Sequence, residues 1–175
     1  MSDSQLMMRR PHLEDLPTVT MPAGYTLRRA SAADAAGLAT LLTAAFGAPW
    51  DEAKVLQEFF ATADIKATLV AVAHDGTLAA CASAAFRPAQ YHDVGYVHWV
   101  GTLPAHGGRS LGYWVSLGVL HVFRELGLVA AVLETDDGRT AALKTYAKLG
   151  FDPFFYQRSH PQRWAAIKAG SQLLS

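Results

Sequence analysis

The sequence has almost no cysteine and no excess of charge of either sign. Its 175 residues include a single cysteine, Cys81, so no internal disulfide can form. Charge of one sign is also missing, because fifteen basic and fifteen acidic residues cancel to a formal net charge of zero. A nucleic-acid-binding surface needs a strong basic excess. We therefore expect neither a disulfide-stabilised scaffold nor a protein with a nucleic-acid partner.

Long apolar runs are missing as well. No stretch of about 18 apolar residues could cross a membrane, and the N-terminal MSDSQLMMRRPHLEDLP has no apolar segment like that of a secretory signal. We therefore expect a cytoplasmic protein with no membrane partner. Apolar residues nonetheless make up 51% of the chain and charged residues 17%, which is enough for the core of one domain.

Residues 94–127 organise the chain, because they predict a strand, a glycine-rich turn and a long amphipathic helix. Alternation along VGYVHWVGTLP favours a strand. A period of two would put Tyr96, His98, Val100 and Thr102 on one face, and Val97 and Trp99 on the other. From Ser110 the apolar residues recur with helical spacing, and Gly127 suits the left-handed residue that ends a helix.

The turn between that strand and helix is rich in glycine. Gly107, Gly108 and Gly112 carry no Cβ atom, so backbone can approach a ligand closely there. The first turn of the helix has unpaired N–H groups and a partial positive charge, and Arg109 adds a cation. These features are typical of a phosphate or pyrophosphate cradle. The same pattern also occurs in a simple turn between strand and helix.

The remaining segments indicate one folded domain with two appendages. Residues 1–24 are expected to form a loosely structured leader, either a disordered arm or a flap over a neighbouring surface. Alternating strands and helices over 25–159 predict an α/β or α+β domain with a mixed sheet covered by helices. Residues 160–175 form a helical extension that packs, through Trp164, either on its own domain or on a second subunit of a homodimer. Trp50 is either a packed hinge or a substrate contact.

Two motifs carry a resemblance to a known family. They are V-G-T-L-P-A-H-G-G-R-S-L-G and T-D-D-G-R-T-A-A-L-K-T-Y-A-K-L-G-F, in that order. Together they resemble the GCN5-related N-acetyltransferase (GNAT) superfamily over about residues 25–159. The resemblance implies the GNAT fold, with a central mixed, mostly antiparallel sheet that contains a splayed strand pair and is flanked by helices. It also implies acetyl-CoA or another acyl-CoA as cosubstrate.

The resemblance further implies which residues bind the acyl-CoA. The backbone of the strand would pair with the pantetheine arm, and the glycine-rich loop would wrap the pyrophosphate. The implied residues are Thr102, Leu103, Gly107, Gly108, Arg109, Ser110, Leu111, Gly112 and Arg139. Three of them depart from the family pattern, since Gly107 replaces an Arg or Gln, Ser110 a glycine and Arg139 an asparagine.

Acyl transfer to an amine needs an acid for the departing thiolate and a base for the amine. Tyr146 matches the family tyrosine, which implies the acid, although a core tyrosine would fit the same position. His98, with an unperturbed pKa of about 6.5, is the first candidate for the base, and a hydrogen-bonded histidine of the sheet is the alternative interpretation. Glu134 on the adjacent strand is the second candidate. His92, Asp93 and His98 lack a further compact ligand, so no metal site is expected.

We therefore expect an enzyme that moves an acetyl group from acetyl-CoA to a small-molecule amine by direct attack in a ternary complex. The acceptor could instead be a protein N-terminus or a lysine. A non-catalytic CoA-binding or regulatory module is the alternative from another class, motivated by the altered positions Gly107, Ser110 and Arg139.

Overall fold

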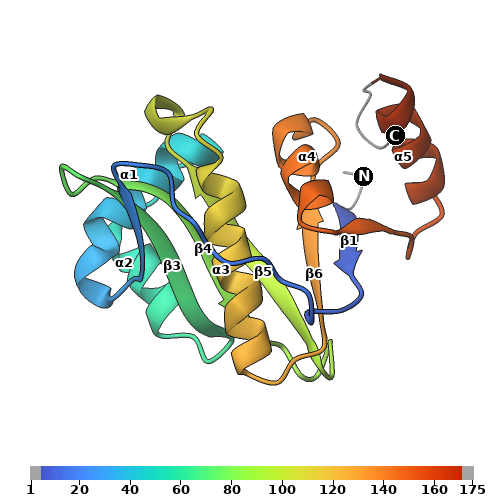
Figure 1. Cartoon of the computed structure of the whole chain (residues 1–175), viewed down its shortest axis with the longest axis horizontal. Helices are drawn as coiled ribbons and strands as arrows, with labels where there is room; N and C mark the ends of the chain where they lie inside the picture. Colours follow the sequence, from blue (N-terminus) through green and yellow to red (C-terminus); the bar gives the residue numbers. More distant parts are fainter. Residues whose placement is uncertain (1–4, 171–175) are drawn as a thin grey trace.

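The structure, a computed structural model, describes residues 5–170 and forms one twisted sheet with helices on both faces (Figure 1). Within these residues the sheet has seven strands in the order β2-β3-β4-β5-β6-β1-β7. The strands are β1 (Leu6–Arg10), β2 (Tyr25–Arg29), β3 (Ile65–Ala73), β4 (Leu78–Ala85), β5 (Val94–Thr102), β6 (Ala130–Thr135) and β7 (Asp152–Phe154). Strands β5 and β6 pair in parallel, and the other neighbouring pairs are antiparallel.

Helices cover both faces of this sheet. They are η1 (Ala32–Asp34), α1 (Ala35–Phe46), α2 (Glu52–Val55), η2 (Leu56–Phe60), η3 (Pro104–His106), α3 (Leu111–Glu125), α4 (Thr140–Lys148) and α5 (His160–Gly170). Helix α3 packs on one face with the main apolar core, and α1, α2 and η2 pack on the other with a second core. The expected mixed, mostly antiparallel sheet flanked by helices is confirmed.

The first strand corrects the expectation of a loosely structured leader. Residues Leu6–Arg10 lie inside the sheet, where β1 pairs with β6 on one side and with β7 on the other. Leu6 and Met8 are fully buried. The guanidinium of Arg10 is buried too, and it donates to the carbonyl oxygen of Leu149 and to Asp15 Oδ1. These two partners stabilise the charge of the buried Arg10, so a charged residue is tolerated in this strand of the sheet.

Residues 11–24 then cross over α3 to reach β2 (Figure 1). Leu13 is 2% exposed and belongs to the main core. Nε2 of His121, on α3, lies 2.8 Å from the carbonyl oxygen of Pro17. This part of the expected leader is therefore packed on the domain. Residues 1–4 of the leader and 171–175 of the C-terminal extension lie outside the described residues.

A bulge in β5 corrects the expected faces of that strand. Pairing with β4 shifts register between Cys81 and Ser83, and Trp99 takes a left-handed φ of 48°. The extra residue turns the following side chains over, because two residues of a bulged strand oppose one of its partner. Val100 consequently packs with Val97 in the core under α3, not on the opposite face with His98. Trp99 packs in the core under α1.

The C-terminal helix packs on the same domain. Trp164 of α5 is 2% exposed and belongs to the main core. Arg163, one residue earlier, is paired with Asp137 in the loop before α4. Of the two alternatives for Trp164, the structure supports packing on its own domain. Among residues 5–170, no helix has the length and apolarity that a membrane span requires.

Candidate active site

The site begins where two parallel neighbours in the sheet separate. Strands β5 and β6 pair through Val94–Ala130, Gly95–Ala131 and Tyr96–Val132, and the pairing stops there. On its other edge β5 stays paired with β4 as far as Thr102. The bulge at Trp99 lies just beyond the last β5–β6 pair and bends the strand at this point. The sheet therefore contains the splayed strand pair that the resemblance implied.

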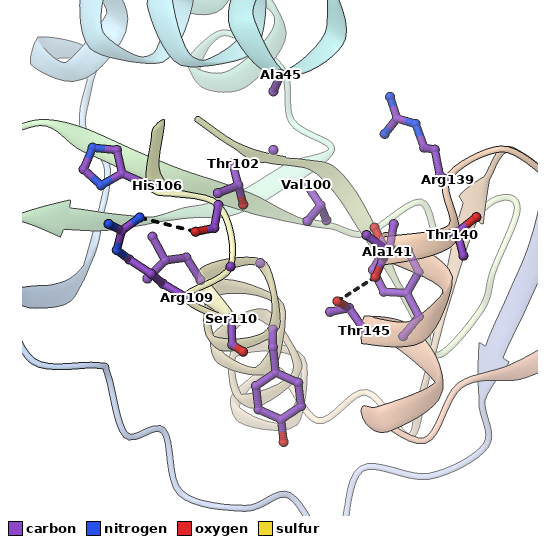
Figure 2. Close-up of a pocket in the computed structure, with 18 of the residues that line it drawn as sticks. Ala45, Val100, Thr102, His106, Arg109, Ser110, Arg139, Thr140, Ala141 and Thr145 are labelled. Carbon is purple, nitrogen blue, oxygen red and sulfur yellow. Dashed lines mark hydrogen bonds between the residues drawn. The ribbon is translucent and has the colours of Figure 1, made fainter. Parts of the chain in front are cut away.

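A cavity of about 650 Å³ lies beside the separated strands. It is lined by the end of β5, the loop before α3, the first turn of α3 and the N-terminal part of α4 (Figure 2). Nine of the residues expected at the site line it: Thr102, Gly107, Gly108, Arg109, Ser110, Leu111, Gly112, Arg139 and Tyr146. The side chain of Leu103 instead packs against the core under α1. His98 and Glu134 do not line this cavity.

The loop before α3 is tightly turned. Gly108 has a φ of 74°, which suits glycine, and Ser110 has a left-handed φ of 56° that costs a non-glycine residue about 1 kcal/mol or more. Ser110 makes no side-chain capping bond, and the first helical bond runs from the Trp114 N–H to the Ser110 carbonyl. The N–H groups of the first turn therefore face the cavity without intrahelical partners, as a binding site for an anion requires.

The two arginines expected to bind the acyl-CoA are held differently. Arg109 is folded onto its own loop, where Nη1 donates to the carbonyl oxygens of Ala105 and Gly107; Figure 2 draws one of these two bonds. Arg139 lies across the cavity from that loop, over the ring of Phe46 and 3.4 Å from Asp136. Both side chains line the cavity, and each has a partner from which it would have to move to contact a phosphate.

Tyr146 lies on the inner face of α4. It is 5% exposed, lines the cavity and contacts the ring of Phe151 edge-on at 6.1 Å. Burial raises the pKa of Tyr146 to about 12, with the Arg139 charge acting weakly in the opposite direction. The phenol is therefore protonated at any physiological pH, and it can donate a hydrogen bond or a proton. The structure gives it the packing of a core tyrosine and a position at the cavity as well.

The candidate bases lie on the face of the sheet away from α3. The Tyr96 hydroxyl donates to Glu134 Oε2 at 2.9 Å, across the point where the strands diverge. His98 follows Tyr96 by two residues, and its ring is 5.1 Å from the Tyr96 ring. Burial, and secondarily the Arg87 charge, lowers the pKa of His98 to about 4. The imidazole is therefore neutral at pH 7 and binds a proton weakly.

An aromatic cluster borders this second face. The rings of Trp99, Trp50, Phe59 and Phe46 contact one another, with the Trp50–Trp99 centroids 4.8 Å apart. Trp50 is thus packed among aromatic neighbours, as the first of its two interpretations expected. Among residues 5–170, no three side chains of His, Cys, Asp or Glu gather as metal ligands would.

Sequence patterns missed several residues of the site. Val100 and Gly101 line the cavity because the bulge at Trp99 reorients the strand, and no residue type in the sequence indicates a bulge there. The Tyr96–Glu134 bond joins two strands that are far apart in the chain. Gly101 itself packs closely against α1, since a Cβ atom at this position would lie 3.1 Å from that of Ala45.

Comparison with protein families identifies the fold independently. The model of the Acetyltransferase (GNAT) family matches residues 35–151. The chain is also similar to a mycothiol acetyltransferase of Mycobacterium sp. (strain MCS), with 33% identity over 159 residues, 84% of this chain and 52% of that protein. A mycothiol acetyltransferase of Nocardia farcinica is 50% identical over 60 residues, 34% of this chain and 20% of that protein. The chain thus spans about half, or less, of the curated relatives it matches.

Solved structures agree on the fold. A GCN5-related N-acetyltransferase from Sphaerobacter thermophilus superposes with a TM-score of 0.68 at 20% identity, over 87% of this chain and 50% of that one. The yncA protein of Salmonella typhimurium, solved with its cofactor acetyl-CoA, superposes with a TM-score of 0.64 at 20% identity, over 77% of this chain and 88% of that one.

Proposed function

The chain belongs to the Acetyltransferase (GNAT) family, and from this premise we propose that it transfers an acetyl group from acetyl-CoA to a primary amine of a small molecule. The amine attacks directly while both substrates are bound. The observation that carries this proposal is the separation of β5 and β6 after Tyr96. A cavity with an anion-binding helix end lies beside the gap, and candidate bases lie on the other face.

The residues present fit acetyl-CoA. The first turn of α3 offers unpaired N–H groups for a pyrophosphate, and the β5 edge beyond Tyr96 has no β6 partner, so its backbone can pair with the amides of a pantetheine arm. When bound, acetyl-CoA supplies an activated thioester carbonyl. Arg109 and Arg139 add charge at the mouth of the cavity once they leave their present partners.

Tyr146 is the proposed acid. A phenol whose pKa is about 12 is a weak acid for an ordinary thiolate in water, whose conjugate acid has a pKa of about 8.5. The difference between the pKa of the phenol and that of the thiol becomes smaller when both are buried, because burial raises the pKa of a thiol as well. Cys81, fully buried in β4, shows the size of the effect in this protein, since burial raises the pKa of its thiol to about 12. Exclusion of water by the bound cosubstrate would raise the proton affinity of the departing sulfur in the same direction, toward that of the phenol.

Glu134 is the proposed base. Its negative charge attracts an ammonium group to the gap between the strands. Of the two carboxylate oxygens, Oε2 accepts the hydrogen bond from the Tyr96 hydroxyl, and Oε1 stays available. Oε1 can then take the proton of the amine directly or through a water molecule. His98, with its pKa lowered to about 4, is a weaker proton acceptor than an ordinary histidine and serves as part of the wall. This choice reverses the order in which the sequence ranked the two candidates.

A small-molecule acceptor is supported by the relatives that are named mycothiol acetyltransferase. The aromatic cluster of Trp99, Trp50, Phe59 and Phe46 beside the gap favours an acceptor with an apolar or planar part. Peptide or protein amines are the remaining acceptor class.

One observation favours a non-catalytic CoA-binding module as a second candidate: the candidate bases, His98 and Glu134, do not line the cavity in which acetyl-CoA would bind. Calorimetric titration with acetyl-CoA, followed by thiol release with a panel of small amines and N-terminal peptides, separates the two. We expect micromolar binding and turnover of at least one small amine. Binding without turnover of any amine would support the module and overturn the enzyme.

A further inference from the structure

Tyr96 makes the bond that spans the diverging strands. It is the last residue of β5 paired with β6, opposite Val132, and Glu134 lies two residues beyond Val132. In a regular parallel ladder the next residues would be joined through the backbone. Here the backbone pairing has stopped, and the Tyr96 hydroxyl reaches Glu134 Oε2 at 2.9 Å instead. A side-chain hydrogen bond thus replaces backbone pairing at the opening of the gap.

The Tyr96 ring is held on several sides. Tyr91 stacks on it at 6.2 Å with an interplanar angle of 14°, and the Arg87 guanidinium lies 4.8 Å from the ring centre. His98 contacts it edge-on at 5.1 Å. Arg87 is fixed in turn by Asp64, whose Oδ2 lies 3.1 Å from Nε. A ring that is 5% exposed and packed in this way has little freedom to swing, so its hydroxyl is held in place.

The Tyr96 hydroxyl is also held in one protonation state. Burial raises the pKa of Tyr96, and the neighbouring Glu134 charge raises it further. The phenol therefore stays protonated throughout the working range of an enzyme. It can act only as a donor toward Glu134, not as the acid of the reaction.

We infer that Tyr96 is a positioning residue for the acceptor side of the reaction. Its hydroxyl binds Glu134 Oε2, orients the carboxylate toward the gap and leaves Oε1 for the proton of the amine. The inference rests on the proposed function, in which Glu134 is the base. It extends that proposal by Tyr96, which does not line the donor cavity and acts through Glu134.

The test compares Tyr96→Phe with Tyr91→Phe. Both variants keep a ring and remove one hydroxyl, but the Tyr91 hydroxyl is bonded to the Gln90 amide and not to Glu134. Carbon-13 NMR at pH 7 measures the chemical shift of the Glu134 side-chain carboxyl, with Glu134→Gln used to assign the signal. We expect this chemical shift to change in Tyr96→Phe and to stay as in the wild type in Tyr91→Phe, because only the first variant loses the hydrogen bond to Oε2.

Kinetics supply a second readout with an amine that the wild-type protein turns over. We expect Tyr96→Phe to lower kcat about tenfold or more and to leave the dissociation constant of acetyl-CoA unchanged, and we expect Tyr91→Phe to do neither. An unchanged Glu134 chemical shift in Tyr96→Phe, or an unchanged kcat, would overturn the inference. A wild-type protein that turned over no amine would overturn the proposed function instead, and the NMR comparison would then decide the role of Tyr96 at Glu134.

Discussion

The guanidinium of Arg139 lies over the ring of Phe46, with its central carbon 5.0 Å from the ring centre. Arg139 precedes α4 and Phe46 ends α1, so this contact joins the two halves of the molecule that border the cavity. A cation–π contact at a partly exposed site contributes about 0.5–1 kcal/mol. A charge-assisted hydrogen bond to a phosphate is worth about 1.5–3 kcal/mol. Because the hydrogen bond is the stronger of the two interactions, we expect Arg139 to move toward the phosphates of a bound acetyl-CoA.

Replacing Arg139 tests that movement. We expect Arg139→Gln to weaken acetyl-CoA binding about tenfold, measured by calorimetry, because the charge-assisted contact is lost. Phe46→Leu removes the competing ring and keeps an apolar side chain, so it should leave acetyl-CoA affinity unchanged or make it tighter by a few fold. Equal affinities in Arg139→Gln and the wild type would show that Arg139 stays on the ring.

Gly108 allows a test of the loop conformation without a steric clash. Its φ is 74°, and no atom lies within 4 Å of the place a Cβ would occupy. Gly108→Ala should therefore cost about 1 kcal/mol of left-handed strain and weaken acetyl-CoA binding by about fivefold. Gly138→Ala is the matched control, since Gly138 also lines the cavity and has open space without a positive φ. Equal acetyl-CoA affinities in the two variants would contradict this role for the loop.

Tyr146→Phe removes the proposed acid while keeping the ring that packs on Phe151. We expect kcat to fall about a hundredfold or more, and the acetyl-CoA dissociation constant to stay the same, because a general acid acts on the departing sulfur and not on binding. Tyr156→Phe is the control, since Tyr156 is exposed and its hydroxyl donates to the carbonyl of Gln5. A Tyr146→Phe enzyme with wild-type kcat would refute the assignment.

The lowered pKa of His98 predicts how the free energy of unfolding depends on pH. Its pKa is about 4 in the folded protein and about 6.5 in an unfolded chain. Between these values the unfolded chain binds more protons, so the free energy of unfolding is highest above about pH 6.5 and falls as the pH drops toward about 4. The loss attributable to His98 is at most about 3 kcal/mol.

Urea unfolding at a series of pH values measures this effect. We expect His98→Gln to remove most of the fall between pH 6.5 and 4, and the exposed His74→Gln to retain it. An identical pH dependence in His98→Gln and the wild type would mean that the surroundings of the His98 ring do not lower its pKa.

Local patterns predicted several of the elements that border the cavity. The strand over Val94–Thr102, the tight turn at Gly107 and Gly108, and the long helix α3 depend on periodicity and on glycine, which act over a few residues. Tyr146 was placed by a motif contained within one helix. The strand, the turn and α3 lie around one cavity because they follow one another in the chain, and Tyr146 of α4 lines the same cavity from a later segment.

The sequence by itself determined the alternation of strands and helices, the glycine turn and the helix end that faces the cavity. Only the tertiary structure decided that Leu6–Arg10 enters the sheet between β6 and β7, that Trp99 forms a bulge, and that Tyr96 reaches Glu134. Each of these depends on pairing between segments distant in the chain. The interactions that stabilise such pairing involve residues of the other segment. One example is the hydrogen bond from the buried Arg10 guanidinium to the carbonyl oxygen of Leu149. The periodicity of one segment does not indicate which other segment it pairs with.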